Sequence, residues 1–134
     1  MEVVVETSRI AAVPALAELP DSELAELAAL MSELEVATGT EVVTVGNYGS
    51  AVYFIEEGNA DVLDDDGEAT NTFGPGDAFG EVGLLLTGER TATVVASTPM
   101  RLLSLSGQDF EGIRSRLPET ERSLRRLGLE RARR

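Results

Sequence analysis

The chain has 134 residues, a length that suits one domain built around a single hydrophobic core. It carries 11 basic and 24 acidic side chains, for a formal net charge of −13, and it contains no His, Cys or Trp. Without Cys and His it has no disulfides, thiolate nucleophiles or near-neutral acid–base groups, and it lacks the commonest transition-metal ligands. Most enzyme classes are therefore excluded, and we expect a protein that binds its ligand without transforming it.

Residues 1–38 are predicted to form an N-terminal helical part. A short helical stretch is expected around Pro14, and a firmer helix begins at Asp21 or Ser22, either of which is able to cap it. The apolar residues of this helix fall on one stripe that we interpret as core: Leu24, Leu27, Leu30, Met31 and Leu34. The stretch is expected to end at Gly39.

Residues 39–105 have the pattern of a β roll. Short β-branched or aromatic runs, separated by turn residues, lie at 41–45, 52–55, 60–63, 92–96 and 101–105. Short strands at such spacing are typical of a sandwich, a jelly roll or a small barrel. The acidic run at 64–67 does not keep EF-hand spacing, because the first and twelfth positions of such a loop would be Val62 and Phe73. We interpret this run as a hairpin turn.

Residues 106–134 return to helix. Ser106 and Asp109 have the spacing of a capping box at the start of one helix, and Pro118 suits the first turn of a second. The chain shows no internal repeat and no linker composition. It is therefore predicted to be a single α+β domain, an antiparallel β roll flanked by N-terminal and C-terminal helices.

The charge is divided unevenly along the chain. Residues 1–113 hold three arginines and 21 acids, a balance of −18, whereas residues 114–134 hold eight arginines and three acids, a balance of +5. Between Ile10 and Met100 there are 17 acids and one base, Arg90. A lone arginine among so many acids is either a structural ion-pair partner or the receptor for a small anion. We favour the receptor.

The segment around Arg90 contains the groups that a small anion needs. A glycine turn at 74–77 leads to Gly80 and Glu81, and a helical turn beginning near Val82 would present unpaired amide donors to an anion. Arg90 is able to close on the same anion with forked, charge-assisted hydrogen bonds. Glu81 has the complementary chemistry, because a carboxylate accepts hydrogen bonds from sugar hydroxyls. A carboxylate for a sugar and a guanidinium for a phosphate predict a nucleotide monophosphate site.

The same segment resembles the phosphate-binding cassette of the cyclic nucleotide-binding domain family. It reads Phe79-Gly80-Glu81-Val82-Gly83-Leu84-Leu85 and, after a short gap, Glu89-Arg90-Thr91-Ala92-Thr93-Val94, with the Glu-to-Arg interval of the family. The likeness extends over about residues 10 to 117, through the glycine turns of the roll. One position departs from the family pattern, because Glu89 stands where the family commonly has Pro. Its negative charge lies close in sequence to the expected anion receptor.

The resemblance implies a role for each residue of the motif. Gly80 and the amide of Val82 would face the cyclic phosphate. Arg90 would pair with the exocyclic phosphate oxygens, and Glu81 would accept a hydrogen bond from the ribose 2′-hydroxyl. Thr91 would add a hydroxyl to the phosphate or to the base. The full set of implied binding residues, including apolar neighbours of the base, is Val62, Phe73, Phe79, Gly80, Glu81, Val82, Arg90 and Thr91.

Two functions remain open at this point. The first is a regulatory sensor of cAMP, with cGMP as the alternative ligand, whose cassette at 79–91 relays occupancy through hinge and lid helices at 106–134. The second is a degenerate domain of the same fold that acts as an interaction module without nucleotide, an alternative favoured by Glu89. A metal-dependent cupin enzyme is disfavoured because the chain has no His.

The remaining expectations concern cofactors, partners and location. We expect no resident cofactor, no metal and no catalytic residue. Partners are expected through the C-terminal helix, as a second copy of the chain or as another protein. DNA is not expected, because no residues follow Arg134 to form a helix-turn-helix. The acidic N-terminus and the lack of a long apolar run predict a cytoplasmic protein without a membrane partner.

Overall fold

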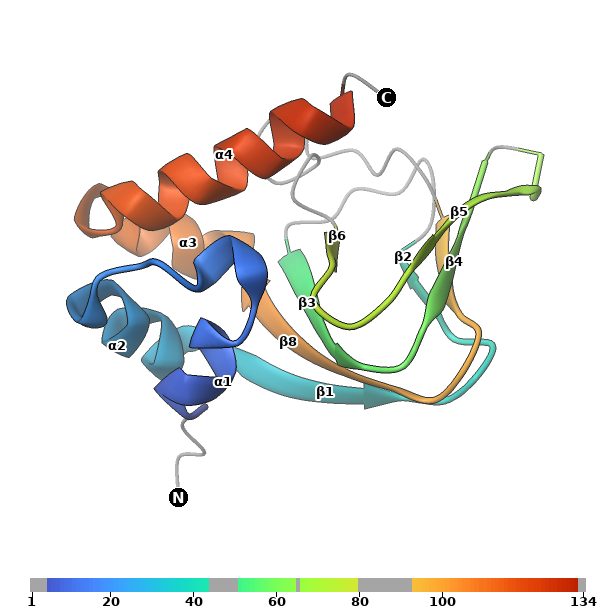
Figure 1. The fold of residues 1–134 in the computed structure, drawn as a ribbon, viewed down its shortest axis with the longest axis horizontal. Coiled ribbons are helices and arrows are strands. Elements are labelled where there is room, and N and C mark those ends of the chain that lie inside the picture. The colour runs from blue at the N-terminus through green and yellow to red at the C-terminus, as the bar shows by residue number, and fades with distance from the viewer. Residues whose placement is uncertain (1–4, 44–50, 65, 80–92, 133–134) are drawn as a thin grey trace.

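A computed structural model of the chain describes residues 5–43, 51–64, 66–79 and 93–132. The helices are α1 (Thr7–Ala11), η1 (Pro14–Leu16), α2 (Asp21–Leu30), α3 (Gly107–Ile113), η3 (Arg114–Arg116) and α4 (Pro118–Ala132). The strands are β1 (Ser32–Val36), β2 (Glu41–Val43), β3 (Ala51–Glu57), β4 (Ala60–Leu63), β5 (Ala69–Phe73), β6 (Ala78–Phe79), β7 (Thr93–Ala96) and β8 (Met100–Ser106). Figure 1 shows the helices from both ends of the sequence gathered on one side of the strands.

The strands of the described residues form two antiparallel sheets. One sheet has the order β1-β8-β3-β6 and the other has the order β2-β7-β4-β5. Strand β8, the last in sequence, pairs with both β1 and β3, so the roll closes between its beginning and its end. This topology confirms the predicted antiparallel β roll flanked by N-terminal and C-terminal helices.

Alternating side chains on β3 separate two hydrophobic cores. Val52 and Phe54 belong to a core that the strand shares with the helices. Tyr53 and Ile55, which alternate with them, belong to a second core inside the roll. The sheet that contains β3 therefore lies between the helices and the interior of the roll.

The N-terminal helical part is shorter than predicted. Helix α2 ends at Leu30, and Leu34, which was expected on its apolar stripe, lies in β1 and is 39% exposed. That prediction was wrong because the position of Leu34 agrees with two patterns. It continues the apolar spacing of the helix, and it also fits the alternation of polar and apolar residues in a strand. The predicted caps Asp21 and Ser22 are also wrong. Pro20 occupies the N-cap position of α2 and makes no side-chain capping bond.

The C-terminal helices begin where the sequence predicts. The hydroxyl oxygen of Ser106 accepts a hydrogen bond from the amide of Asp109 at 3.1 Å, at the start of α3. Helix α4 begins at Pro118, and its Leu124 side chain is buried in the core beneath the helices. In the described part of the chain, no helix is long and apolar enough to cross a membrane.

Candidate functional site

A glycine turn connects β5 to β6 and leads the chain toward the predicted cassette. The amide of Asp77 donates to the carbonyl of Gly74 at 3.0 Å, and Gly76 after Pro75 has φ of +92°, as a type II turn requires. Ile55 of β3 holds the turn, because its amide donates to Asp77 O and its carbonyl accepts from the Gly76 amide, both at 2.9 Å. The entry to β6 is therefore fixed relative to β3.

Three aromatic rings stack where β6 ends. Phe79 pairs with Tyr53 of β3 in register, and their ring centroids are 5.2 Å apart. Phe73, at the end of β5, stacks on Phe79 with centroids 5.8 Å apart and planes inclined by 7°. These contacts hold the last described residue before the rest of the cassette inside the roll. Tyr53 was not predicted here, although its alternation with Val52 and Phe54 places it on the inner face of β3.

The structure describes three of the eight predicted binding residues. It brings Phe73 and Phe79 into stacking contact. Val62 is half-buried on β4, two residues from Ala60, which pairs with Phe73 in register, so Val62 and Phe73 share one face of their sheet. The other five lie outside the described residues, and their roles stay predictions: Gly80, Glu81, Val82, Arg90 and Thr91.

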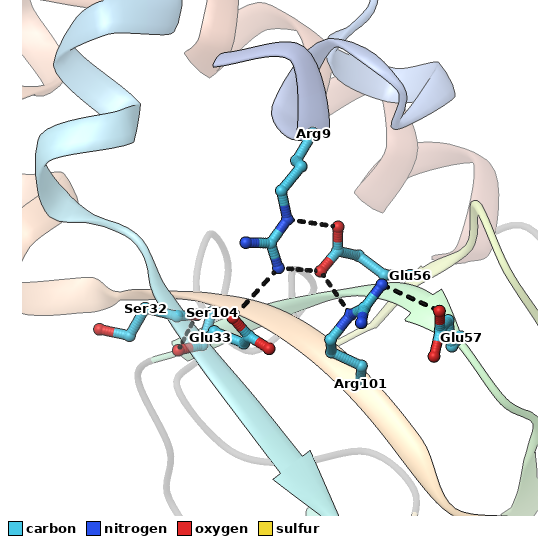
Figure 2. Close-up of polar contacts among 7 residues, drawn as sticks. All are labelled: Arg9, Ser32, Glu33, Glu56, Glu57, Arg101 and Ser104. Carbon is cyan, nitrogen blue, oxygen red and sulfur yellow. Dashed lines mark hydrogen bonds and ion pairs between the residues drawn. The ribbon is translucent and has the colours of Figure 1, made fainter. Parts of the chain in front are cut away.

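A cluster of five charged side chains joins α1 to the roll (Figure 2). Arg9 of α1 donates from Nε and Nη2 to the two carboxylate oxygens of Glu56 in β3, and the Nε contact is 2.9 Å. Its Nη2 also lies 3.3 Å from Glu33 of β1. Arg101 of β8 pairs with Glu56 at 3.3 Å and donates to Glu57 at 2.9 Å. We call these five residues the α1 clamp, because they fix α1 on β1, β3 and β8.

The α1 clamp bears on anion binding because it engages two of the three arginines in residues 1–113. Arg9 and Arg101 both pair with glutamates, so their charges are already compensated within the fold. The third arginine of this part of the sequence is Arg90, inside the predicted cassette. The clamp thus removes two competing candidates for the anion receptor.

The α1 clamp also makes stability depend on pH. Hydrogen bonds from Arg9 hold the pKa of Glu56 below its usual range, and they outweigh the opposing effect of burial. A carboxylate with a pKa lowered by folding stabilises the fold above its unfolded pKa, near 4.5, and stops doing so as the pH falls through its folded pKa. We expect Glu56→Gln to lower the free energy of unfolding by about 2 kcal/mol near pH 7 and by much less near pH 3.

Urea unfolding of the two proteins over this pH range measures the difference. Glu57→Gln is the matched control, because it removes the same charge from the neighbouring residue, whose carboxylate is 64% exposed. The control is expected to change the free energy of unfolding by less than about 0.5 kcal/mol. A Glu56→Gln effect that stays constant down to about pH 3 would mean that Glu56 stabilises the fold through packing and not through its charge.

The acidic run between β4 and β5 has a structural explanation. Asp64 Oδ1 accepts hydrogen bonds from the amides of Asp66 at 2.9 Å and Glu68 at 3.0 Å, and Gly67 has φ of +82°. These contacts confirm the predicted hairpin turn. Among the described residues, no group of three or more acidic side chains is arranged to hold a metal ion.

A known protein family matches more than half of the chain. The family described as "Cyclic nucleotide-binding domain" matches residues 33–116, which include most of the roll and the whole predicted cassette. The chain belongs to the cyclic nucleotide-binding domain family. Members of this family are ligand-binding regulatory domains, so the resemblance based on the motif is confirmed.

Relatives among the cyclic nucleotide-binding proteins cover most of this chain. A cyclic nucleotide-gated potassium channel from Rhizobium etli is 34% identical over 122 residues, which are 91% of this chain and 34% of the channel. A cAMP-dependent protein kinase regulatory subunit from Yarrowia lipolytica is 39% identical over 101 residues, 74% of this chain and 27% of the subunit. The regulatory subunit of a cAMP-independent protein kinase A from Trypanosoma brucei, solved as a mutant bound to cAMP, has a TM-score of 0.77. It is 31% identical, and the match covers 90% of this chain and 44% of that one. The chain thus spans less than half the length of each relative.

Proposed function

We propose that this domain binds cAMP, with cGMP as the alternative ligand, in the cassette at 79–91. Gly80 and the amide of Val82 face the cyclic phosphate. Arg90 donates forked hydrogen bonds to the exocyclic phosphate oxygens, and Glu81 accepts a hydrogen bond from the ribose 2′-hydroxyl. The base lies toward the inner face of β4 and β5, near Val62 and Phe73, and the hydroxyl of Thr91 donates to the phosphate or the base.

The family match over residues 33–116 carries this proposal, because it contains the complete motif from Phe79 to Val94 and the strands on both sides. The engagement of Arg9 and Arg101 in the α1 clamp supports Arg90 as the phosphate ligand. The relative from Yarrowia lipolytica, described as cAMP-dependent, favours cAMP as the nucleotide.

Isothermal titration with cAMP and cGMP tests the proposal, with thermal unfolding as a second readout. We expect saturable heat with at least one of them, and stabilisation of about 2.7 kcal/mol when the ligand is at about 100 times its Kd. The matched control is 5′-AMP, which keeps the base, the ribose and a phosphate but lacks the cyclic ester. It is expected to bind much more weakly than cAMP.

No heat and no thermal shift with either cyclic nucleotide at millimolar concentration would contradict the proposal. That result would favour the degenerate domain without nucleotide, with the negative charge of Glu89 as its first explanation. Replacement of Glu89 with Pro, the residue that the family commonly has there, would then be expected to restore binding.

We propose that the output of binding is mechanical and not chemical. The domain relays occupancy through its C-terminal helices to a second copy of the chain or to another protein in the cytoplasm, and it transforms no substrate. The acidic balance of residues 1–113 disfavours nucleic acid as the partner of the roll. The potassium channel and kinase subunit relatives are longer proteins in which such a domain is one part.

A further inference from the structure

Helix α4 receives its N-terminal capping group from a different helix. The residue before the helix is Leu117, which is buried and has no side-chain oxygen to accept the amides of the first turn. Glu23 of α2 takes this role. Its Oε1 accepts from the amide of Thr120 at 2.8 Å and from the hydroxyl of Thr120 at 2.9 Å. Its Oε2 accepts from the amide of Glu119 at 3.3 Å.

This contact is shielded from water. Glu23 is 5% exposed and Thr120 is 1% exposed. A buried carboxylate is costly unless donors compensate its charge, and here two amides and a hydroxyl do so at the positive end of the helix dipole. Apolar packing of α4 on its neighbours would tolerate small rotations and shifts, whereas three directed hydrogen bonds to one carboxylate fix the first turn in one place.

The contact continues a chain of attachments that begins at the roll. The α1 clamp holds α1 on β1, β3 and β8, and α1 packs against α2. Glu23 then joins α2 to α4, which also packs against η1. Pro14 of η1 lies beside the glycine turn that leads into β6, since a Cβ on Gly76 would be 3.4 Å from Pro14 Cδ. Helix η1 therefore contacts both α4 and the turn that leads into the cassette.

We infer that Glu23 is the positioning residue of α4: it attaches the start of α4 to α2, so that the N-terminal and C-terminal helices respond to a ligand as one unit. The response to a ligand rests on the proposed function, but the attachment is a property of the ligand-free chain. Hydrogen exchange without ligand tests the attachment, and hydrogen exchange with cAMP tests the response.

Hydrogen exchange of the ligand-free 134-residue chain tests the attachment. In Glu23→Gln the side-chain oxygen is still able to accept from Thr120. The NH2 group that replaces Oε2 is a donor and cannot accept from the Glu119 amide, and the negative charge is lost. We expect amides 119–121 to exchange on the order of tenfold faster, while α3 is unchanged. Glu26→Gln is the matched control: Glu26 of the same helix also reaches the segment before α4, through Arg116, but both side chains are exposed, so we expect wild-type exchange.

A second variant keeps the test decisive if Glu23→Gln folds poorly. Thr120→Val removes the hydroxyl donor and should accelerate the same amides, whereas Thr120→Ser retains the hydroxyl and should not. In the double variant with Glu23→Gln, the effect of Thr120→Val should be smaller than in the wild-type background. Wild-type exchange in Glu23→Gln, or additive effects in the double variant, would overturn the inference.

Hydrogen exchange in the presence of cAMP tests whether α2 and α4 respond to the ligand together. In the wild type we expect cAMP to change the exchange of α2 and α4 together. In Glu23→Gln we expect titration heat to persist and α4 to respond, while the response of α2 is lost. An unchanged response of α2 in that variant would overturn the coupling. If the wild type gives no titration heat, the proposed function fails, and the ligand-free exchange still decides whether Glu23 attaches α4.

Discussion

Replacement of Arg90 with alanine should lower the affinity of the domain for cAMP by a factor of about 30 to 4,000. A guanidinium and a phosphate combine opposite charges with two parallel hydrogen bonds. Truncation of one partner in such a desolvated pair costs about 2–5 kcal/mol, and each 1.4 kcal/mol is a factor of ten in Kd. No basic residue close in sequence is able to replace Arg90, because it is the one base among 17 acids between Ile10 and Met100.

The control for Arg90→Ala has to separate a local contact from the overall charge. Arg122→Ala changes the net charge from −13 to −14, as Arg90→Ala does, but Arg122 is 62% exposed and pairs with Glu119 on α4. Titration calorimetry at two salt concentrations compares the variants. We expect wild-type affinity for Arg122→Ala, and an intermediate loss for Arg90→Lys, which keeps the charge but not the fork.

Two outcomes would contradict the role of Arg90. Wild-type affinity in Arg90→Ala would remove this residue from the site. Equal losses in Arg90→Ala and Arg122→Ala would mean that affinity follows the net charge and not a contact with the phosphate. Thermal unfolding of both variants without ligand shows whether a loss of affinity comes instead from a loss of folded protein.

The elements that the sequence predicts well are those whose local pattern agrees with their environment. The runs that become β3, β4, β7 and β8 are rich in β-branched, aromatic or aliphatic residues and are mostly buried or half-buried, so period and composition both indicate strands. The Ser106 cap and Pro118 are local signals that depend on no distant partner.

The elements that the sequence misses are those in which the local pattern is weak or ambiguous. Strand β5, Ala69–Phe73, is mostly exposed and lies at the edge of its sheet, so no apolar alternation marks it. Strand β6 has two residues, too few to show a period. Strand β1 follows α2 directly, and Leu34 continues the apolar stripe of that helix. Pairing with β8 turns this segment into a strand, which is a tertiary effect.

The polar contacts that organise the helices depend on residues far apart in sequence. Glu23 and Thr120 are 97 residues apart, and Arg9 and Glu56 are 47 apart. Each glutamate looks like any solvated carboxylate in an acidic sequence, and only the packed fold shows which ones are buried and paired. The cassette was predictable for the opposite reason, because its residue types recur at fixed spacing within one short segment.

Replacement of Gly58 with alanine should lower the free energy of unfolding by about 4 kcal/mol. Gly58 lies in the turn between β3 and β4 and has φ of +93°, where a Cβ costs about 1–2 kcal/mol. The space for that Cβ is also taken. It would overlap the carbonyl oxygen of Pro99 and lie 2.9 Å from Met100 Cα, and close-packed backbone yields only at a further cost of about 1–3 kcal/mol.

The neighbourhood of Gly58 explains why the turn cannot relax. The next residue, Asn59, donates from its amide to Thr98 Oγ1 at 2.9 Å and accepts from the amide of Ser97 at 3.0 Å. These bonds hold the β3–β4 turn against the turn between β7 and β8, so a shift that makes room for a Cβ would break them. Strain is therefore expected to appear as lost stability and not as a small local rearrangement.

Gly67→Ala separates the two contributions to the Gly58 effect. Gly67 has φ of +82°, close to that of Gly58, but nothing lies within 4 Å of a Cβ placed there. Urea unfolding should therefore show a loss of about 1–2 kcal/mol for Gly67→Ala, from the backbone conformation alone. The excess in Gly58→Ala measures the contact with Pro99 and Met100. Equal losses in the two variants would show that Pro99 and Met100 make room for the Cβ without loss of stability. The backbone conformation alone would then require glycine in both turns.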